Sequence, residues 1–300
     1  MANSAQLSPR LRQKADSAQL CRYGAPMLTE TAHAKLNLAL HVRARREDGY
    51  HELESVFAFC EDGDDLRATL RDDGELTLTI EGPFADELGA GEDNLVLRAA
   101  RALQSASGTH LGADLTLDKI LPIASGIGGG SADAAAALRL LLRLWDIRPM
   151  DIDFPAIAAS LGADVPACLG SQTVFGTGVG DKLETIDLDL AGTPVLLVNP
   201  LVSCPTGPVF KGWDGTDRGP LDPQAWRRGR NDLAMPAIAL VPEIDEVLAV
   251  LRAQIPQLAR MSGSGATCFA LFGSEAECEA AADRIENDHP DWWLMTTRLR

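Results

Sequence analysis

The chain has 300 residues, of which 46% are hydrophobic and 23% are charged, and its formal net charge at pH 7 is -16. These values are typical of one large or two ordinary globular domains. The negative charge argues against a nucleic-acid partner, because a phosphate backbone requires clustered Lys and Arg. A small phosphorylated ligand remains compatible, because it needs only a local positive field.

Residues 1–27 are polar and unpatterned and lack the apolar stretch of a secretory signal, so we expect a disordered or loosely ordered tail. A transit peptide is the alternative. No apolar run reaches the roughly 20 residues that a membrane span needs. The six cysteines form no CxxC pair, which favours buried or free thiols over a zinc site or a redox pair. We therefore expect a cytoplasmic protein without membrane contact.

The first patterned segment, residues 34–42 (AKLNLALHV), alternates in polarity and predicts a half-buried strand. One face carries Leu36, Leu38, Leu40 and Val42, and the other carries Lys35, Asn37, Ala39 and His41. Acidic, glycine-containing turns separate the next segments. These are strands over 52–60 and 75–80, a helix from Leu95 capped by Asp93 or Asn94, and a strand over 114–120.

A glycine-rich stretch then precedes a long apolar helix pattern over residues 131–145. Four glycines fall within the five positions 126–130, directly before Ser131. A helix start leaves about four N–H groups unpaired and carries roughly half a positive charge. Glycines let the backbone approach a ligand closely, so the stretch predicts a phosphate cradle. Ser131 would cap the helix or contact a phosphate or its metal ion.

The remaining segments indicate a mixed helix and sheet arrangement. A short helix over 156–162 ends at Gly162, and the segment 206–229 is rich in loop residues. The other predicted elements are a buried strand over 193–200, a helix over 242–254, a strand over 266–273, a helix over 274–287 capped by Ser274, and a strand over 292–299.

Several phosphate motifs compete for the glycine stretch. The P-loop pattern is absent, because no Lys precedes Ser131. The dinucleotide fingerprint fails at its third glycine, and Asp146 follows a helix instead of a second strand. A tight turn without a ligand is the structural alternative, although four glycines raise the entropic cost of folding.

A third motif fits from Pro122 to Ser131 (PIASGIGGGS), and here the sequence resembles the GHMP kinases, named for galactokinase, homoserine kinase, mevalonate kinase and phosphomevalonate kinase. Two further segments resemble that family, TAHAKLNLALHV at 31–42 and MSGSGATCFALF at 261–272. Gly263 and Gly265 suggest close backbone approach, and in the family this second loop packs beside the first.

The resemblance covers nearly the whole chain after residue 28 and is closest to the branch that acts in non-mevalonate isoprenoid synthesis. The segments that carry it, in order, are AKLNLALHV, DGYHELESVF, EDNLVLRAARAL, LPIASGIGGGSADAA, LGADVPACLG, GVGDKLE and MSGSGATCFALF. It implies an α+β, two-domain GHMP kinase fold. An N-terminal domain like domain 2 of ribosomal protein S5 would span 28–188, and a ferredoxin-like C-terminal domain would span 189–300. Ala132 departs from the family, because many members have a second serine there.

The resemblance also implies a reaction. ATP would phosphorylate the 2-hydroxyl of 4-diphosphocytidyl-2-C-methyl-D-erythritol, giving the 2-phosphate and ADP. Asp164 would be the general base, and the Lys35 ammonium would keep it ionised and orient the acceptor hydroxyl. Alone, the two residues suggest a turn residue and a solvated face. Asn37, Tyr50, His51 and Phe210 would bind the substrate, the last three around its cytosine. The predicted ATP site comprises Pro122, Ile123, Ala124, Ser125, Gly126, Ile127, Gly128, Gly129, Gly130, Ser131, Ala132 and Asn94.

No carboxylate cluster stands out, so we predict that Mg²⁺ arrives with ATP and keeps several waters, without a protein metal cage. The predicted partners are small molecules, with neither nucleic acid nor membrane, and the chain would be a monomer or a weak homodimer. Three alternatives stay open. They are another GHMP small-molecule kinase of the homoserine or mevalonate type, a non-catalytic ATP-binding or sensor protein, and an RNA-binding module that shares only the broad fold of the first domain.

Overall fold

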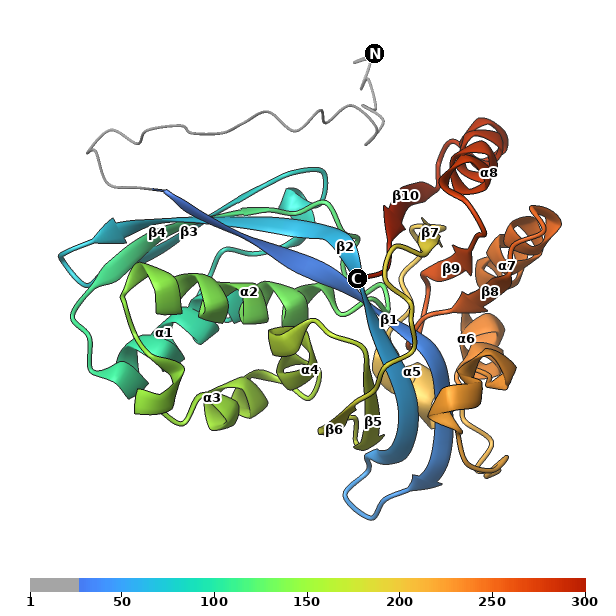
Figure 1. Ribbon diagram of the computed structural model, residues 1–300, viewed down its shortest axis with the longest axis horizontal. Helices are drawn as coiled ribbons and strands as arrows, with labels where there is room; N and C mark the ends of the chain where they lie inside the picture. Colours follow the sequence, from blue (N-terminus) through green and yellow to red (C-terminus); the bar gives the residue numbers. More distant parts are fainter. Residues whose placement is uncertain (1–26) are drawn as a thin grey trace.

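Figure 1 shows the computed structural model, which describes residues 27–300. The tail predicted over 1–27 therefore lies, except for its last residue, outside the described residues. Residues 27–300 form two sheets, one of six strands and one of four. Helices from the first half lie along one face of the larger sheet, and the smaller sheet stands beside it with its own helices (Figure 1).

The larger sheet is organised by a long antiparallel pair, β1 (Leu28–Arg45) and β2 (His51–Arg71). Its strand order is β3-β4-β2-β5-β6, with β1 paired to β2. The remaining strands are β3 (Leu76–Glu81), β4 (Gly112–Asp118), β5 (Val174–Gly178) and β6 (Lys182–Thr185). Only the β3–β4 pair is parallel within this sheet.

The turn predicted after residue 60 is wrong, because β2 continues through the acidic segment 61–65 to Arg71. β1 begins early enough to pair with that segment, as in the pair Thr31 and Asp65. Gly63 allows the close pairing, since a Cβ there would lie 1.9 Å from the Ala32 carbonyl oxygen. The acidic, glycine-containing residues 61–65 are therefore part of a strand, because β1 is long enough to pair with them.

The half-buried character predicted for residues 34–42 is also wrong, because every residue from Lys35 to Val42 is buried. Leu36 and Leu38 share a core cluster with Val195 and Phe269 of the smaller sheet. β1 also shows three register shifts against β2, which break the simple alternation of faces. A strand lying between two parts of the molecule has no solvent face.

The helices of the first half are α1 (Leu95–Ser107), α2 (Gly129–Leu144), α3 (Phe154–Leu161) and α4 (Val165–Gly170). Asn94 caps α1, because its side chain accepts the Val96 N–H at 2.9 Å. The cap predicted for α2 is wrong. α2 begins at Gly129 with Gly128 as N-cap, so Ser131 lies inside the first turn. The run Ala134–Ala137 is fully buried, and these small side chains let α2 lie close to the sheet.

The smaller sheet has the order β10-β7-β9-β8 and is antiparallel throughout. Its strands are β7 (Pro194–Asn199), β8 (Leu258–Met261), β9 (Cys268–Leu271) and β10 (Trp293–Arg298). Its helices are α5 (Thr206–Lys211), α6 (Ala234–Leu240), α7 (Glu243–Ala253) and α8 (Glu275–Asp288). Ser274 caps α8 as predicted, accepting the Glu277 N–H.

The loop predicted over 206–229 is wrong in part, because it contains α5 and the 3-10 helix η3 (Pro223–Arg228). Two other 3-10 turns are η1 (Ala85–Glu87) and η2 (Pro149–Asp151). Elements this short show little sequence periodicity, and the seven-residue α6 was not predicted either. The domain division at residue 188 stays a prediction. Among the described residues, no helix is both long and apolar enough to cross a membrane.

Candidate active site

The glycine loop connects β4 to α2 and turns sharply at Gly126 and Gly128, where φ is 78° and 67°. It is anchored on β1, because the Lys35 N–H donates to the Ile127 carbonyl at 3.0 Å. The Ala132 N–H bonds back to Gly128, so the N–H groups of residues 129–131 precede the helical hydrogen-bond pattern. This is the N–H array that an anion cradle requires.

The predicted nucleotide residues differ in their exposure along this loop. Buried residues are Pro122, Ser125, Ile127 and Ala132; half-buried residues are Ile123, Gly126, Gly128, Gly129 and Ser131; Ala124 and Gly130 are exposed. Ala132 belongs to the core of the first sheet and its helices. The alanine that replaces the family's second serine therefore packs inward.

The second glycine loop lies directly against the first, as the sequence suggests. A Cβ on Gly126 would lie 2.5 Å from the Ser262 carbonyl oxygen and 2.7 Å from that of Gly265. The Ser262 hydroxyl donates to the Gly126 carbonyl at 3.0 Å, and the Thr267 N–H donates to the Ser125 carbonyl at 3.0 Å. The two loops meet backbone to backbone, which only glycines allow.

Lys35 and Asp164 form an ion pair with 2.8 Å between Nζ and Oδ2. The lysine side chain is 4% exposed and the aspartate 39%. Asp164 precedes α4, yet its carboxylate makes no cap hydrogen bond. Lys35 Nζ also lies 4.6 Å from the centre of the Phe57 ring. The arrangement holds an accessible carboxylate beside a buried ammonium.

Asn37 lies two residues from Lys35, at the meeting of both loops. Its amide donates to the Ser55 hydroxyl at 2.8 Å, and its backbone N–H donates to the Ser262 hydroxyl at 3.1 Å. Its Oδ1 is buried without a hydrogen-bond partner among the described residues. That oxygen would lie 3.3 Å from a Cβ on Gly263. Asn37 therefore keeps a free acceptor beside the second loop.

The structure brings together His51 and Phe210, whose ring centres are 5.1 Å apart. Trp213, which the sequence did not single out, packs edge-on against His51 with ring centres 5.7 Å apart. Burial lowers the pKa of His51, and the Arg45 charge lowers it further. Tyr50 is 62% exposed in the adjoining turn, so its contact with a base stays a prediction.

Asn94 uses its side chain for structure, since it also donates to the Gly89 carbonyl at 2.9 Å. Its neighbour Leu95 lies beside the glycine loop, where its Cδ1 would be 3.3 Å from a Cβ on Gly130. The predicted contact with adenine therefore stays a prediction, and the amide is already engaged as the cap of α1.

Sequence reasoning missed two groups of buried polar residues around the loops. Lys119 lies between Asp64 and Asp133, 2.6 Å from each carboxylate. Asn231 donates from one amide nitrogen to the carbonyls of Met261 and Gly263, both at 2.8 Å. The available signal was that Lys119 lies directly before the apolar residues 120–123, which lead into the loop. No sequence signal pointed to Asp64 or Asn231, because both lie far from the loops in the sequence.

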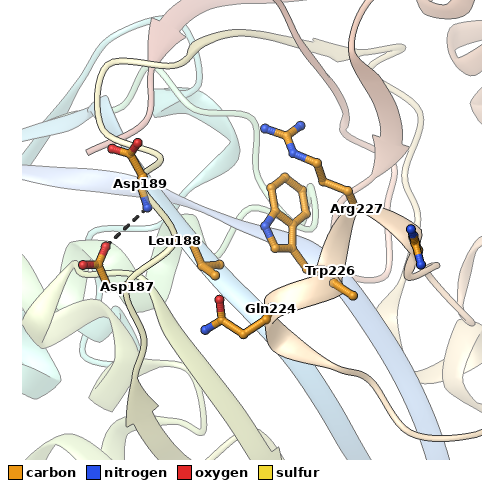
Figure 2. Close-up of a pocket in the computed structure, with 8 residues that line it drawn as sticks. Asp187, Leu188, Asp189, Gln224, Trp226 and Arg227 are labelled. Carbon is orange, nitrogen blue, oxygen red and sulfur yellow. Dashed lines mark hydrogen bonds between the residues drawn. The ribbon is translucent and has the colours of Figure 1, made fainter.

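A surface cavity of about 710 Å³ lies elsewhere, between the segment after β6 and η3 (Figure 2). Asp187, Leu188, Asp189, Gln224, Ala225, Trp226, Arg227 and Arg228 line it. Arg227 stacks over the Trp226 ring at 4.6 Å, and the Asp189 N–H donates to Asp187 (Figure 2). The cavity contains no predicted site residue and mixes both charges, so we do not assign it to the reaction.

No group of three or more His, Cys, Asp or Glu side chains in residues 27–300 is arranged to hold a metal ion. The glycine loop and the first turn of α2 instead offer N–H groups to an anion. The triphosphate group of a nucleotide suits this set of N–H donors. Whether Mg²⁺ comes with the nucleotide stays a prediction.

The fold and the site together are those of a small-molecule kinase, with a glycine loop whose N–H groups suit a phosphate. Two family patterns match, "GHMP kinases N terminal domain" over residues 94–172 and "GHMP kinases C terminal" over residues 219–291. A 4-diphosphocytidyl-2-C-methyl-D-erythritol kinase of Rhizorhabdus wittichii is 55% identical over 91% of this chain and 94% of its own length. The same enzyme of Sphingopyxis alaskensis is 50% identical over 91% and 99%.

Comparison with solved structures points to the same family as these sequence relatives. A crystal structure of 4-(cytidine 5'-diphospho)-2C-methyl-D-erythritol kinase superposes with a TM-score of 0.77 and 34% identity, covering 90% of this chain and 99% of that one. Homoserine kinase from Cytophaga hutchinsonii gives 0.65 and 16%, covering 91% and 95%, which shows the fold alone. The chain therefore belongs to the GHMP kinases, and within them to the 4-diphosphocytidyl-2-C-methyl-D-erythritol kinase family. The predicted family, fold and kinase activity are confirmed.

Proposed function

We propose that the chain transfers the γ-phosphoryl group of ATP to the 2-hydroxyl of 4-diphosphocytidyl-2-C-methyl-D-erythritol, with Asp164 as general base and Lys35 as its orienting partner. The observation that carries this assignment is the position of Lys35. A Cβ on Gly128 would lie 3.1 Å from Lys35 Cε, and Lys35 Nζ lies 2.8 Å from Asp164. One side chain thus links the glycine loop to the carboxylate.

Phosphoryl transfer proceeds through a loose transition state, so positioning and charge neutralisation supply most of the catalysis. The acceptor hydroxyl must lose its proton as it attacks, and a carboxylate within hydrogen-bond reach can take it. The Lys35 ammonium favours the ionised form of the Asp164 carboxylate. Because Asp164 is 39% exposed, a substrate hydroxyl can approach it from the solvent side.

The other end of the substrate would be held by the His51 and Phe210 rings, whose centres are 5.1 Å apart and whose planes are tilted by 40°. Base–aromatic stacking contributes roughly 1–3 kcal/mol per base. Asn37 would contact the middle of the substrate only after the second glycine loop moves, because its Oδ1, unpaired among the described residues, is buried beside Gly263. The distribution of these groups along β1 and the start of β2 suits an elongated molecule with a base at one end and an alcohol at the other.

Magnesium would accompany ATP and neutralise phosphate charge, keeping water ligands. In that arrangement this chain contributes the N–H groups at the start of α2 and the Lys35 charge beside them. We further propose a cytoplasmic monomer or weak homodimer, since both substrates are charged small molecules.

Replacing Asp164 with Asn tests the assignment of the base. We expect kcat to fall about 10²- to 10⁴-fold, because the general base is lost while its shape is kept. ADP release would be measured with ATP and the cytidine substrate, alongside thermal unfolding. Asp151→Asn removes an exposed carboxylate paired with Arg148 and serves as the control, with unchanged turnover. Wild-type turnover by a folded Asp164→Asn protein would refute the assignment.

A substrate panel distinguishes the remaining kinase alternatives. The wild-type protein should release ADP with 4-diphosphocytidyl-2-C-methyl-D-erythritol and not with mevalonate or homoserine. The reverse pattern would overturn the proposed substrate while leaving the kinase chemistry intact.

A further inference from the structure

Lys119 occupies an unusual position, directly beneath the first residue of α2. A Cβ on Gly129 would lie 3.1 Å from Lys119 Nζ, closer than side chains normally approach. The ammonium is 3% exposed, and it donates to Asp64 and Asp133 at 2.6 Å each. It therefore lies behind the N–H groups of the glycine loop, on the side away from solvent.

Asp64 connects this lysine to the entrance of the loop. Its Oδ2 accepts from Lys119, while its Oδ1 accepts the N–H groups of Ile120 and Leu121 at 2.7 and 2.8 Å. The carboxylate is 0% exposed and comes from the middle of β2. One aspartate thus fixes both the lysine and the chain that leads into the glycine loop.

Asp133 connects the same lysine to the exit of the loop. It lies in the second turn of α2 and is 2% exposed, and its Oδ1 has no hydrogen-bond partner among the described residues. Burial is the main cause that raises its pKa, against the opposing effect of Lys119. With both carboxylates ionised the cluster carries a charge of about -1, so Lys119 adds no net positive charge for a phosphate.

We propose that Lys119 is a positioning residue for the nucleotide, which holds the entrance and the exit of the glycine loop at a fixed separation through Asp64 and Asp133. The proposal rests on the assignment of ATP to this loop. Its physical basis is that a loop of glycines has little rigidity of its own, so the N–H array must be fixed from behind. Catalysis by positioning loses rate and affinity steeply when such a support is removed.

The test compares Lys119→Met/Asp133→Asn with Asp133→Asn alone. The double variant removes the lysine without leaving two buried carboxylates unpaired, and the single variant is its matched reference. We expect the Kd of the double variant for an unhydrolysable ATP analogue to rise at least tenfold over the reference. The Kd for the cytidine substrate, measured without nucleotide, should change less than threefold. Both would be measured by calorimetry.

A second pair of variants leaves every charge in place. Gly129→Ala would push against Lys119, whereas Gly130→Ala would meet only Leu95 Cδ1, at 3.3 Å. We expect the nucleotide Kd to rise at least fivefold more in Gly129→Ala than in Gly130→Ala. This comparison decides the question if the lysine variant does not fold.

Two results would overturn the positioning role. One is a nucleotide Kd within threefold of the reference in a folded Lys119 variant, and the other is an equal loss of affinity for both substrates, which would indicate general damage. Failure of the proposed function has a different signature, because the wild-type protein itself would then not bind the ATP analogue.

Discussion

Lys35 and Asp164 differ in solvent exposure, and this difference matches their proposed roles. The lysine is buried and fixed by the glycine loop, while the aspartate reaches solvent. A buried ammonium without its partner is costly, whereas an exposed carboxylate can be hydrated. The pair therefore places the fixed charge inside and the proposed general base where a substrate can reach it.

Asp133 provides a prediction on stability against pH. Burial raises its folded pKa above the ordinary value of 3.8 to about 7. A carboxyl with a raised pKa binds its proton more tightly in the folded state, so its contribution to stability is complete below about pH 4. That contribution falls as pH rises towards 7. The Asp133→Asn variant has no ionisable group at this position, so its free energy of unfolding lacks this dependence on pH.

The measurement is urea unfolding of wild type and Asp133→Asn at pH 5 and pH 8. We expect the free energy of unfolding of Asp133→Asn, relative to wild type, to increase between these pH values. A difference that is constant with pH would show that Asp133 keeps its ordinary pKa. Asp64, Lys119 and Cys168 are the titratable groups that interact with Asp133. The pKa values of Lys119 and Cys168 are raised and lie above this range.

At the level of elements, the two glycine loops illustrate what a sequence can reveal. The motif at 126–131 predicted a turn into a helix with exposed N–H groups, and the structure has that geometry. Of the two roles expected for Ser131, the cap is wrong, because the helix already begins at Gly129 after a left-handed Gly128, whose backbone a sequence pattern does not reveal. Lys119 and Asn231 could not be assigned, because their roles depend on partners such as Asp64 that only the folded chain brings near.

The contact between the loops predicts the effect of a small substitution. Gly126→Ala places a methyl group 2.5 Å from the Ser262 carbonyl and also strains a residue with φ of 78°. Gly108, the C-cap of α1, has φ of 66° with nothing within 4 Å of a Cβ, so Gly108→Ala adds the strain alone. That strain costs about 1–2 kcal/mol.

We expect Gly126→Ala to lower the free energy of unfolding by at least about 1 kcal/mol more than Gly108→Ala, and to lose turnover. Urea unfolding and an ADP-release assay on both variants measure this. Equal losses of stability would mean that the loops can separate without cost.

At the level of the whole molecule, the two sheets share one core cluster. Leu36 and Leu38 of β1 pack with Leu197 of β7 and Phe269 of β9. Sequence patterns correctly predicted most of the longer elements on both sides of this junction. They gave the wrong exposure for β1, because alternation describes one strand and not the second sheet that covers it.

The shared core predicts that the two halves unfold together. Leu38→Ala removes a fully buried side chain at the junction and should cost about 2–5 kcal/mol. Far-UV circular dichroism, which reports on the whole chain, should show the same urea midpoint as tryptophan fluorescence in a Trp145→Phe background. The four tryptophans that remain there all lie in the second half, at 213, 226, 292 and 293. Separate midpoints for the two signals would contradict a shared core.

The contact between Gly126 and Ser262 also limits when the two loops can assemble during protein synthesis. A ribosome must extend the nascent chain beyond Ala266 before the second loop can lie on the first, although the N–H array of the first loop is synthesised much earlier. A truncated product ending before β8 would carry the first glycine loop without the backbone that packs against it, so the proposed nucleotide site would be completed only near the end of translation.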